Sequence, residues 1–204
     1  MKIICIGRNY AEHVRELNHD TPEHPLFFIK PDSALLQRGQ PFFYPDFSTE
    51  IDYELELVVR INRLGKNIQP KFAHKYYFEV ALGIDFTARD LQREAIAKGN
   101  PWTMAKGFDD SALVSEFVPL ADMAKDIQDL NFELRKNGST VQQGYTGNML
   151  FAVNDLIAYI SQYMTLKIGD FIFTGTPAGV GSIQIGDTLE GWLENRSMLS
   201  CRIK

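Results

Sequence analysis

The sequence predicts a β-rich α+β fold, in which a mixed, mostly antiparallel sheet core carries a few peripheral helices. Three observations predict it. Short runs of β-branched and aromatic residues end at glycine, proline or asparagine, few segments have helical spacing, and strands do not alternate regularly with helices. Regular alternation would favour a parallel, doubly wound sheet instead. No stretch rich in Gly, Pro and Ser divides the chain, so residues 1–204 are expected to form a single domain.

The expected strands are short and apolar. The longest candidate runs from Ile51 to Ile61, and a nearly continuous apolar run from Glu79 to Phe86 follows it. Glycine and asparagine residues separate the candidates, as is usual for hairpins and turns. The remaining candidates cover residues 2–6, 26–29, 171–173, 188–193 and 198–203.

Four helices are expected. The first begins at Asn9, because Asn9 and Glu12 have the spacing of an Asx variant of the capping box. Tyr10, Val14 and Leu17 then fall on one helical face. The other three cover about residues 70–77, 90–98 (ending at Gly99) and 148–163.

Composition excludes several classes of protein. Hydrophobic residues make up 45% and charged residues 23%, as in ordinary globular domains. The net charge of −5 lacks the basic surplus of a nucleic-acid binder, so no nucleic-acid partner is expected. No apolar run is long enough for a membrane helix or a signal peptide, so we expect no membrane partner and a cytoplasmic location. Cys5 and Cys201 have no disulfide-framework or zinc-site spacing.

Motifs for nucleotide binding and for serine acyl transfer are missing. Gln184 stands where a dinucleotide fingerprint beginning at Gly179 needs glycine, and Arg60 stands where a P-loop ending at Lys66 needs glycine. No G-x-S-x-G nucleophile elbow is present. The sequence therefore gives no support to a nucleotide cofactor or to serine chemistry.

The segment Ile51–Val59 places carboxylates at alternate positions. Asp52, Glu54 and Glu56 share one face of a strand, because successive side chains point to opposite faces. This face is either solvated or part of a site, and the spacing alone leaves both interpretations open. Asp85 ends the next apolar run, where the chain leaves the core. Neighbouring carboxylates need a counter-charge, and oxygen ligands favour Mg²⁺, then Mn²⁺, over Ca²⁺.

His13 and Glu16 are three residues apart on the first expected helix, so their side chains are neighbours. A carboxylate beside an imidazole makes the imidazole a stronger base, which suits a general base for water. The alternative is an exposed ion pair of little consequence. His19, His24 and His74 have no such partner and are expected at the surface.

Local cations could hold an anionic substrate even in an acidic protein, although each could equally be a solvated surface charge. The turn from Thr174 to Gly181 is a further candidate, because its N–H groups and the Thr176 hydroxyl could bind a carboxylate. The alternative is a plain structural loop. The cations at strand ends and turns are Arg8, Lys30, Arg89 and Lys106.

Together these segments resemble the fumarylacetoacetate hydrolase family, most closely its small, single-domain, acylpyruvase-like branch. They occur in the family's order and span residues 3 to 190. The matching residues are Gly7-Arg8-Asn9-Tyr10-Ala11, His13 with Glu16, Phe28-Ile29-Lys30-Pro31, Tyr53-Glu54-Leu55-Glu56-Leu57, Asp85-Phe86-Thr87-Ala88-Arg89-Asp90 with Gln92, Lys106, the turn from Thr174 to Gly181, and Gly186-Asp187.

The resemblance implies a β-roll core that binds Mg²⁺ or Mn²⁺ through Glu54, Glu56 and Asp85. It also implies a lid helix carrying His13 and Glu16, and commonly a homodimer. The implied reaction is hydrolysis of a carbon–carbon bond in a 2,4-diketo acid (an acylpyruvate) to pyruvate and a carboxylic acid.

In the implied mechanism the His13–Glu16 pair deprotonates the attacking water and Lys106 joins it in catalysis. Alternative reactions are tautomerisation or decarboxylation of oxaloacetate and isomerisation of 2-hydroxyhepta-2,4-diene-1,7-dioate. A catalytically silent protein that binds small acids is the non-enzyme alternative. The residues expected to hold the keto-acid substrate are Arg8, Lys30, Arg89, Gln92, Gly175 and Thr176.

Overall fold

The structure is a computed structural model that describes residues 1–16 and 20–204. Its largest sheet has seven strands in the order β2-β1-β11-β4-β5-β7, with β8 also pairing with β5. Only the β1–β11 pair is parallel among these described strands, so the expected mixed, largely antiparallel sheet is confirmed. The bounds are β1 Ile3–Gly7, β2 Leu26–Lys30, β4 Leu55–Arg60, β5 Glu79–Asp85, β7 Ala112–Val114, β8 Val118–Pro119 and β11 Phe171–Phe173.

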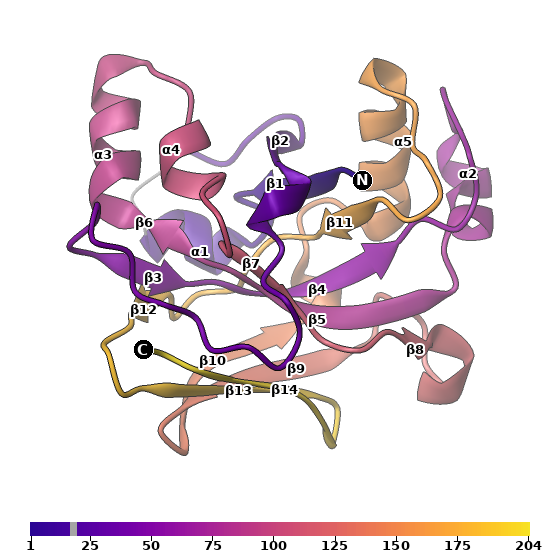
Figure 1. Ribbon diagram of the computed structural model, residues 1–204. Coiled ribbons are helices and arrows are strands. Elements are labelled where there is room, and N and C mark those ends of the chain that lie inside the picture. Colours follow the sequence, from indigo (N-terminus) through magenta and orange to yellow (C-terminus); the bar gives the residue numbers. More distant parts are fainter. Residues whose placement is uncertain (17–19) are drawn as a thin grey trace.

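A second sheet of four strands lies beneath β4 and β5 in Figure 1, in the order β10-β9-β13-β14. The β9–β10 hairpin was not expected from the sequence. Its turn is Asn137-Gly138, where both residues have positive φ (52° and 82°), as a tight two-residue hairpin turn requires. The bounds are β9 Asn131–Lys136, β10 Ser139–Tyr145, β13 Thr188–Leu193 and β14 Arg196–Arg202.

The helices are short and lie at two ends of the large sheet. Figure 1 shows α3 and α4 together at one end, and α5 beside α2 at the other. Helix α5 begins five residues later than expected, and α4 was not expected. The bounds are α1 Ala11–Glu16, α2 Pro70–Ala73, α3 Arg89–Lys98, α4 Thr103–Lys106 and α5 Val153–Tyr163, with 3₁₀ turns at Asp32–Ala34, His74–Tyr76, Leu120–Met123 and Thr146–Asn148.

Strand β4 is covered on both faces. Leu57 lies in the main core between the sheets, whereas Val58 packs on the opposite side with Ile3 and Phe173. Burying such a side chain contributes about 1.5–3 kcal/mol, so this strand is held firmly from both sides. The carboxylate of Glu56 on β4 therefore lies in the protein interior and not in bulk water.

The expected strand from Ile51 to Ile61 is two strands that belong to different sheets. Strand β3 (Ile51–Tyr53) pairs with β12 (Gly181–Ser182) and β6 (Thr87–Ala88), whereas β4 pairs with β5 and β11. Glu54 lies between them. The N–H of Leu55 donates to the side-chain Oε1 of Gln142 (2.9 Å), because no strand offers it an acceptor at the break.

The expected helix cap at Asn9 is wrong. Helix α1 begins two residues later, and the Asn9 amide is fully buried. It donates to the carbonyls of Thr174 (2.7 Å) and Phe151 (3.1 Å) and accepts from the Phe151 N–H (2.8 Å). A side chain that joins three chain segments cannot also cap a helix. Leu17 and His19 lie outside the described residues.

Candidate metal centre and active site

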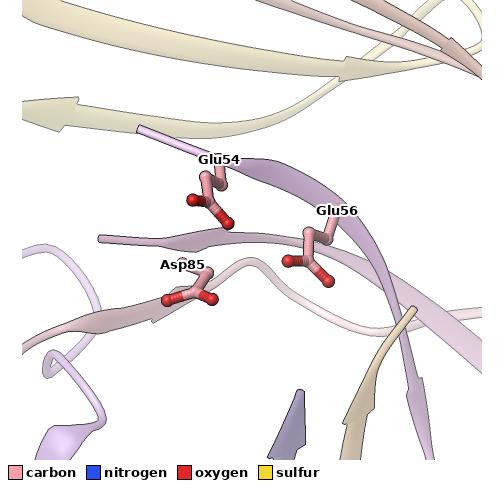
Figure 2. Close-up of side chains that lie close together, drawn as sticks. All are labelled: Glu54, Glu56 and Asp85. Carbon is pink, nitrogen blue, oxygen red and sulfur yellow. The ribbon is translucent and has the colours of Figure 1, made fainter. Parts of the chain in front are cut away.

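Glu54, Glu56 and Asp85 converge as the sequence suggested. Each offers a carboxylate oxygen, and the three oxygens lie within 4.8 Å of one another. Figure 2 shows the three carboxylates turned toward the same space: Glu54 from the junction of β3 and β4, Glu56 from β4 and Asp85 from the end of β5. None of the three residues is more than 6% exposed, so the interpretation of a solvated strand face is wrong. Asp52 is not part of this cluster.

Two buried lysines neutralise part of this charge. Lys106 Nζ donates to Glu54 Oε2 (2.9 Å) and to Asp85 Oδ2 (2.8 Å). Lys30 Nζ lies 2.7 Å from Asp85 Oδ1 and also donates to the carbonyls of Phe86 and Ser111. Both lysines are buried, so the surface-charge interpretation is wrong for them.

Arg89 joins the cluster from the start of α3. Its Nε donates to Asp52 Oδ2 (2.7 Å), a second guanidinium nitrogen donates to Glu54 Oε1 (2.6 Å), and the third donates to Gln92 Oε1 (2.5 Å). Arg89 is 8% exposed, so it is not a surface charge either. Arg8 is half-buried, and its φ of 60° lies in the left-handed region.

The pKa values of the two glutamates shift in opposite directions. Burial would raise the pKa of Glu54, but the cationic Lys106 and Arg89 hold that pKa well below its ordinary value. Burial also opposes the charge on Lys106, yet Asp85 and Glu54 raise the pKa of its ammonium. Burial and the nearby Asp85 and Glu54 carboxylates raise the pKa of Glu56. No described cation lies within ion-pair distance of Glu56.

This arrangement fits a hard divalent cation. At this site the described residues bring four buried carboxylates together with three buried cations, and Glu56 is the carboxylate without a cationic partner. A cation beside Glu56 would offset its unbalanced charge. All three converging ligands are carboxylates, the donor type that Mg²⁺ and Mn²⁺ prefer.

The turn after β11 holds the carboxylates in place. The N–H of Gly175 donates to Glu56 Oε2 (2.6 Å), so the expectation that this N–H binds a substrate carboxylate is wrong. Gly175 has φ +99°, and a Cβ there would lie 2.7 Å from the Cβ of Asn9, so only glycine fits. The hydroxyl of Thr176 donates to the carbonyl of Leu55 (2.8 Å).

His13 and Glu16 form the expected pair, in which the imidazole is buried and the carboxylate is exposed. His13 is 4% exposed, and its Nδ1 lies 3.1 Å from Glu16 Oε2. Glu16 also accepts a hydrogen bond from the N–H of Gly179 (3.1 Å), which fixes the carboxylate beside the imidazole. His24 and His74 are exposed, as expected.

A narrow cavity of about 40 Å³ brings the pair and the cluster together. Lys30 does not line this cavity and instead lies against Asp85, so its expected contact with substrate stays a prediction that this lining does not support. Glu56 and Asp85 lie deeper, behind the lining. The expected site residues that line the cavity are Arg8, His13, Glu54, Arg89, Gln92, Lys106 and Thr176.

Sequence reasoning missed an apolar wall of this cavity. Phe28 and Trp102 meet edge to face with ring centres 5.8 Å apart, and Lys106 Nζ lies 5.3 Å from the centre of the Phe28 ring. The proximity of Trp102 to Lys106 in the sequence is the signal that could have found it. Gln142 was also missed, and the sequence holds no local signal for it.

Within residues 1–16 and 20–204, no helix combines the length and the apolar character needed to cross a membrane.

Comparison with protein-family models gives a match over residues 2–204 to the model described as fumarylacetoacetate (FAA) hydrolase C-terminal. A bovine protein named oxaloacetate tautomerase FAHD1, mitochondrial, is 40% identical over 202 residues, which are 99% of this chain and 90% of that protein. The Escherichia coli K12 protein named oxaloacetate tautomerase YcgM is 38% identical over 197 residues, 97% of this chain and 90% of that protein.

Solved structures of related proteins have the same fold. Fumarylpyruvate hydrolase from Pseudomonas aeruginosa, in complex with Mn²⁺ and pyruvate, superposes with a TM-score of 0.93 at 33% identity. That comparison covers 100% of this chain and 89% of the other. A 2-hydroxyhepta-2,4-diene-1,7-dioate isomerase from Mycobacterium marinum gives 0.85 at 32% identity, over 99% of this chain and 73% of the other.

Proposed function

Because this chain belongs to the fumarylacetoacetate hydrolase family, we propose that it is a metal-dependent enzyme that interconverts the keto and enol forms of oxaloacetate. The observation that carries the proposal is the cavity that His13 shares with Glu54, one of the three converging buried carboxylates. The names of the bovine and bacterial relatives favour this reaction over the others in the family.

Glu54, Glu56 and Asp85 would hold the metal, and Mg²⁺ or Mn²⁺ fits them. The bound ion would supply a Lewis acid that stabilises negative charge on the C2 oxygen of a keto acid. Ca²⁺ fits less well, because it takes about six to eight oxygen ligands at longer distances. The Mn²⁺ in the fumarylpyruvate hydrolase structure supports a divalent ion in this family.

Tautomerisation moves one proton from C3 to the C2 oxygen, so the site needs a group that accepts and returns a proton. We assign this role to the imidazole of His13. Its Nδ1 is engaged by Glu16, which leaves Nε2 to take the C3 proton and to deliver it to the oxygen. Glu16 stabilises the imidazolium that forms between the two transfers. Such acid–base catalysis contributes about 10²- to 10⁴-fold in rate.

We assign the substrate carboxylates to the cations and donors that line the cavity. Arg89 and Lys106 present fixed positive charge there, and Gln92 adds a neutral amide that can form hydrogen bonds. Arg8 lies at the same cavity and is the further cation for the second carboxylate.

Hydrolysis of an acylpyruvate is the second candidate, favoured by the likeness to fumarylpyruvate hydrolase. Here His13 would take a proton from water, and the water oxygen would add to the C4 carbonyl. The bond between C3 and C4 then breaks, which yields a carboxylic acid and the enolate of pyruvate. That enolate takes up a proton at C3 to become pyruvate.

Enol absorbance distinguishes the candidates. Enol-rich oxaloacetate and, separately, acetylpyruvate are mixed with the purified protein and Mg²⁺. We expect faster loss of the oxaloacetate enol, abolished by a chelator and restored by Mg²⁺ or Mn²⁺. His13→Ala should slow the reaction at least about 100-fold, whereas His24→Ala, which removes an exposed histidine, should have no effect.

Each other outcome has a meaning. Acetate release from acetylpyruvate without any effect on the oxaloacetate enol would replace the first candidate by the second. Turnover that survives complete removal of metal would refute the metal's role. Oxalate binding without turnover of any keto acid would identify a catalytically silent binding protein.

A homodimer and a cytoplasmic location stay predictions. Sedimentation velocity of the purified protein tests the first, and fractionation of cells that express the protein tests the second.

A further inference from the structure

We propose that Gln142 is a positioning residue that ties the two glutamate ligands to the loop holding Glu16. The inference rests on the proposed function, because it concerns the geometry of the metal and acid–base groups. Gln142 does not line the cavity, and its side chain is 2% exposed.

A β-bulge aims Gln142 out of its own sheet. In the β9–β10 ladder Thr140 pairs with Arg135, and Gln142 pairs with Leu134, so Val141 is an extra residue on β10. Bulges of this kind redirect the following side chain. Here the side chain of Gln142 reaches from β10 to Leu55 at the junction of β3 and β4.

The side-chain oxygen of Gln142 accepts the backbone hydrogen bond that is left unpaired at the break between β3 and β4. Its Oε1 accepts the N–H of Leu55 at 2.9 Å, a buried group that pairs with no strand. Leu55 lies between Glu54 and Glu56, so the position of its backbone determines the positions of the Cα atoms from which both glutamate side chains extend. An unpaired buried N–H is costly, and the break is therefore stable only while an acceptor stands there.

The donor end of Gln142 holds the loop that follows β11. Its Nε2 donates to the Thr176 hydroxyl (2.9 Å) and to the Pro177 carbonyl (3.1 Å). Thr176 gives its single hydroxyl proton to the carbonyl of Leu55, so a closed ring of hydrogen bonds joins strand and loop. Leu55 N–H requires an acceptor and Pro177 C=O requires a donor, which fixes the orientation of the amide.

The same loop reaches the acid–base pair two residues later. The N–H of Gly179 donates to Glu16, and Glu16 contacts His13. Gly179 packs against the bulge so closely that a Cβ would collide with the carbonyl oxygen of Val141. Gln142 and the bulge therefore place the loop that supplies this N–H.

Two variants separate the two ends of Gln142. Gln142→Met keeps the length of the side chain and removes both functions. Gln142→Glu keeps an acceptor for Leu55 and removes the donor to the loop. Gln143→Met is the matched control, because Gln143 is exposed on the same strand and makes no side-chain hydrogen bond to a described residue.

Mn²⁺ affinity by titration calorimetry and the kinetics of oxaloacetate enol loss are the two measurements. We expect Gln142→Met to weaken Mn²⁺ binding about tenfold or more and to lower kcat, as loss of outer contacts to metal ligands commonly does. Gln142→Glu should keep Mn²⁺ affinity at least at the wild-type level, and its kcat should fall about tenfold with little change in KM. Gln143→Met should match the wild type.

Equal Mn²⁺ affinities for Gln142→Met and Gln143→Met would overturn the proposal. So would an unchanged kcat in Gln142→Glu, which also decides the matter if Gln142→Met does not fold. If the wild type binds Mn²⁺ but turns over no keto acid, the proposed function fails and the affinity measurement still tests Gln142. A wild type that binds no divalent ion overturns both.

Discussion

Lys30 Nζ lies 2.7 Å from Asp85 Oδ1, and neither side chain reaches solvent. The ammonium also donates to the Ser111 hydroxyl (3.0 Å), so it is held on several sides. Lys30 therefore acts as an internal counter-ion to Asp85, one of the three proposed metal ligands.

Replacing Lys30 with Met leaves the buried carboxylate of Asp85 short of positive charge. We expect the free energy of unfolding of the metal-free protein to fall by about 3–5 kcal/mol, as on removal of one partner of a buried pair. Saturating Mg²⁺ should reduce this loss, because a dication replaces part of the missing charge. Urea unfolding with and without Mg²⁺ measures both values.

Lys98→Met is the control, because Lys98 forms an exposed pair with Glu94 on α3. Its effect should stay below about 1 kcal/mol. Equal losses for the two variants would contradict the counter-ion role of Lys30.

Replacing Glu56 with Gln should abolish metal binding without lowering the stability of the metal-free protein. Glu56 is buried and no described cation pairs with it, so the amide removes a charge that the fold does not balance. In the wild type, Mg²⁺ at 100 times its Kd should add about 2.7 kcal/mol to the free energy of unfolding. Thermal unfolding should show this gain lost in Glu56→Gln and kept in Glu190→Gln. An undiminished gain in Glu56→Gln would remove Glu56 from the ligand set.

Replacing Asn9 with Asp tests whether this side chain caps a helix or forms buried hydrogen bonds between chain segments. An aspartate at a helix cap would cost little, because Asp caps helices as well as Asn does. At the observed position it cannot donate to the carbonyls of Thr174 and Phe151. We expect a loss of about 3 kcal/mol or more from unpaired buried groups and a buried charge. Denaturant unfolding measures it, with the exposed Asn148→Asp as control, and a loss near zero would restore the cap.

Acid should reduce the contribution of Asp90 to stability. Burial raises its pKa, but hydrogen bonds from Ser48 and from the amides of Thr49 and Leu91 outweigh burial and lower the pKa below its ordinary value. The folded state therefore favours the ionised carboxyl. Its contribution is complete above the unfolded pKa of about 3.9 and is lost as pH falls through the lower folded pKa.

Asp90→Asn should thus be less stable than the wild type near neutral pH, and the difference should shrink below about pH 4. Urea unfolding between neutral and acidic pH measures this. Asp122→Asn alters an exposed carboxyl with no side-chain hydrogen bond to a described residue, and it should show no such trend. A constant difference between wild type and Asp90→Asn would contradict the assignment.

Local patterns predicted the apolar strands but not the polar hairpin. Runs such as Phe171–Phe173 are visible because burial requires apolar residues. Strands β9 and β10 are half polar, because one face of that sheet is partly exposed. A search for apolar runs therefore did not identify them. The Asn137-Gly138 pair between them is a hairpin signal and could have revealed them.

The proposed metal ligands on the β3–β4 segment were visible in the sequence, because carboxylates at alternate strand positions share a side. The spacing could not decide whether the strand face that carries these carboxylates is exposed to solvent or buried. The answer depends on Lys106, Arg89 and Lys30, which arrive from distant segments and bury the cluster. Contacts between segments far apart in sequence also explain why Asn9 and Gln142 were misjudged or missed.

The parallel pairing of β1 with β11 has a consequence for synthesis of the protein. The hydrogen bond from Asn9 to Thr174 spans 165 residues, so β1 can pair early with β2, but its other edge has no partner until most of the chain has followed. Contacts of such sequence separation form slowly, and the waiting apolar strand is open to aggregation. A nascent chain therefore carries all three carboxylates long before the turn that holds Glu56 exists.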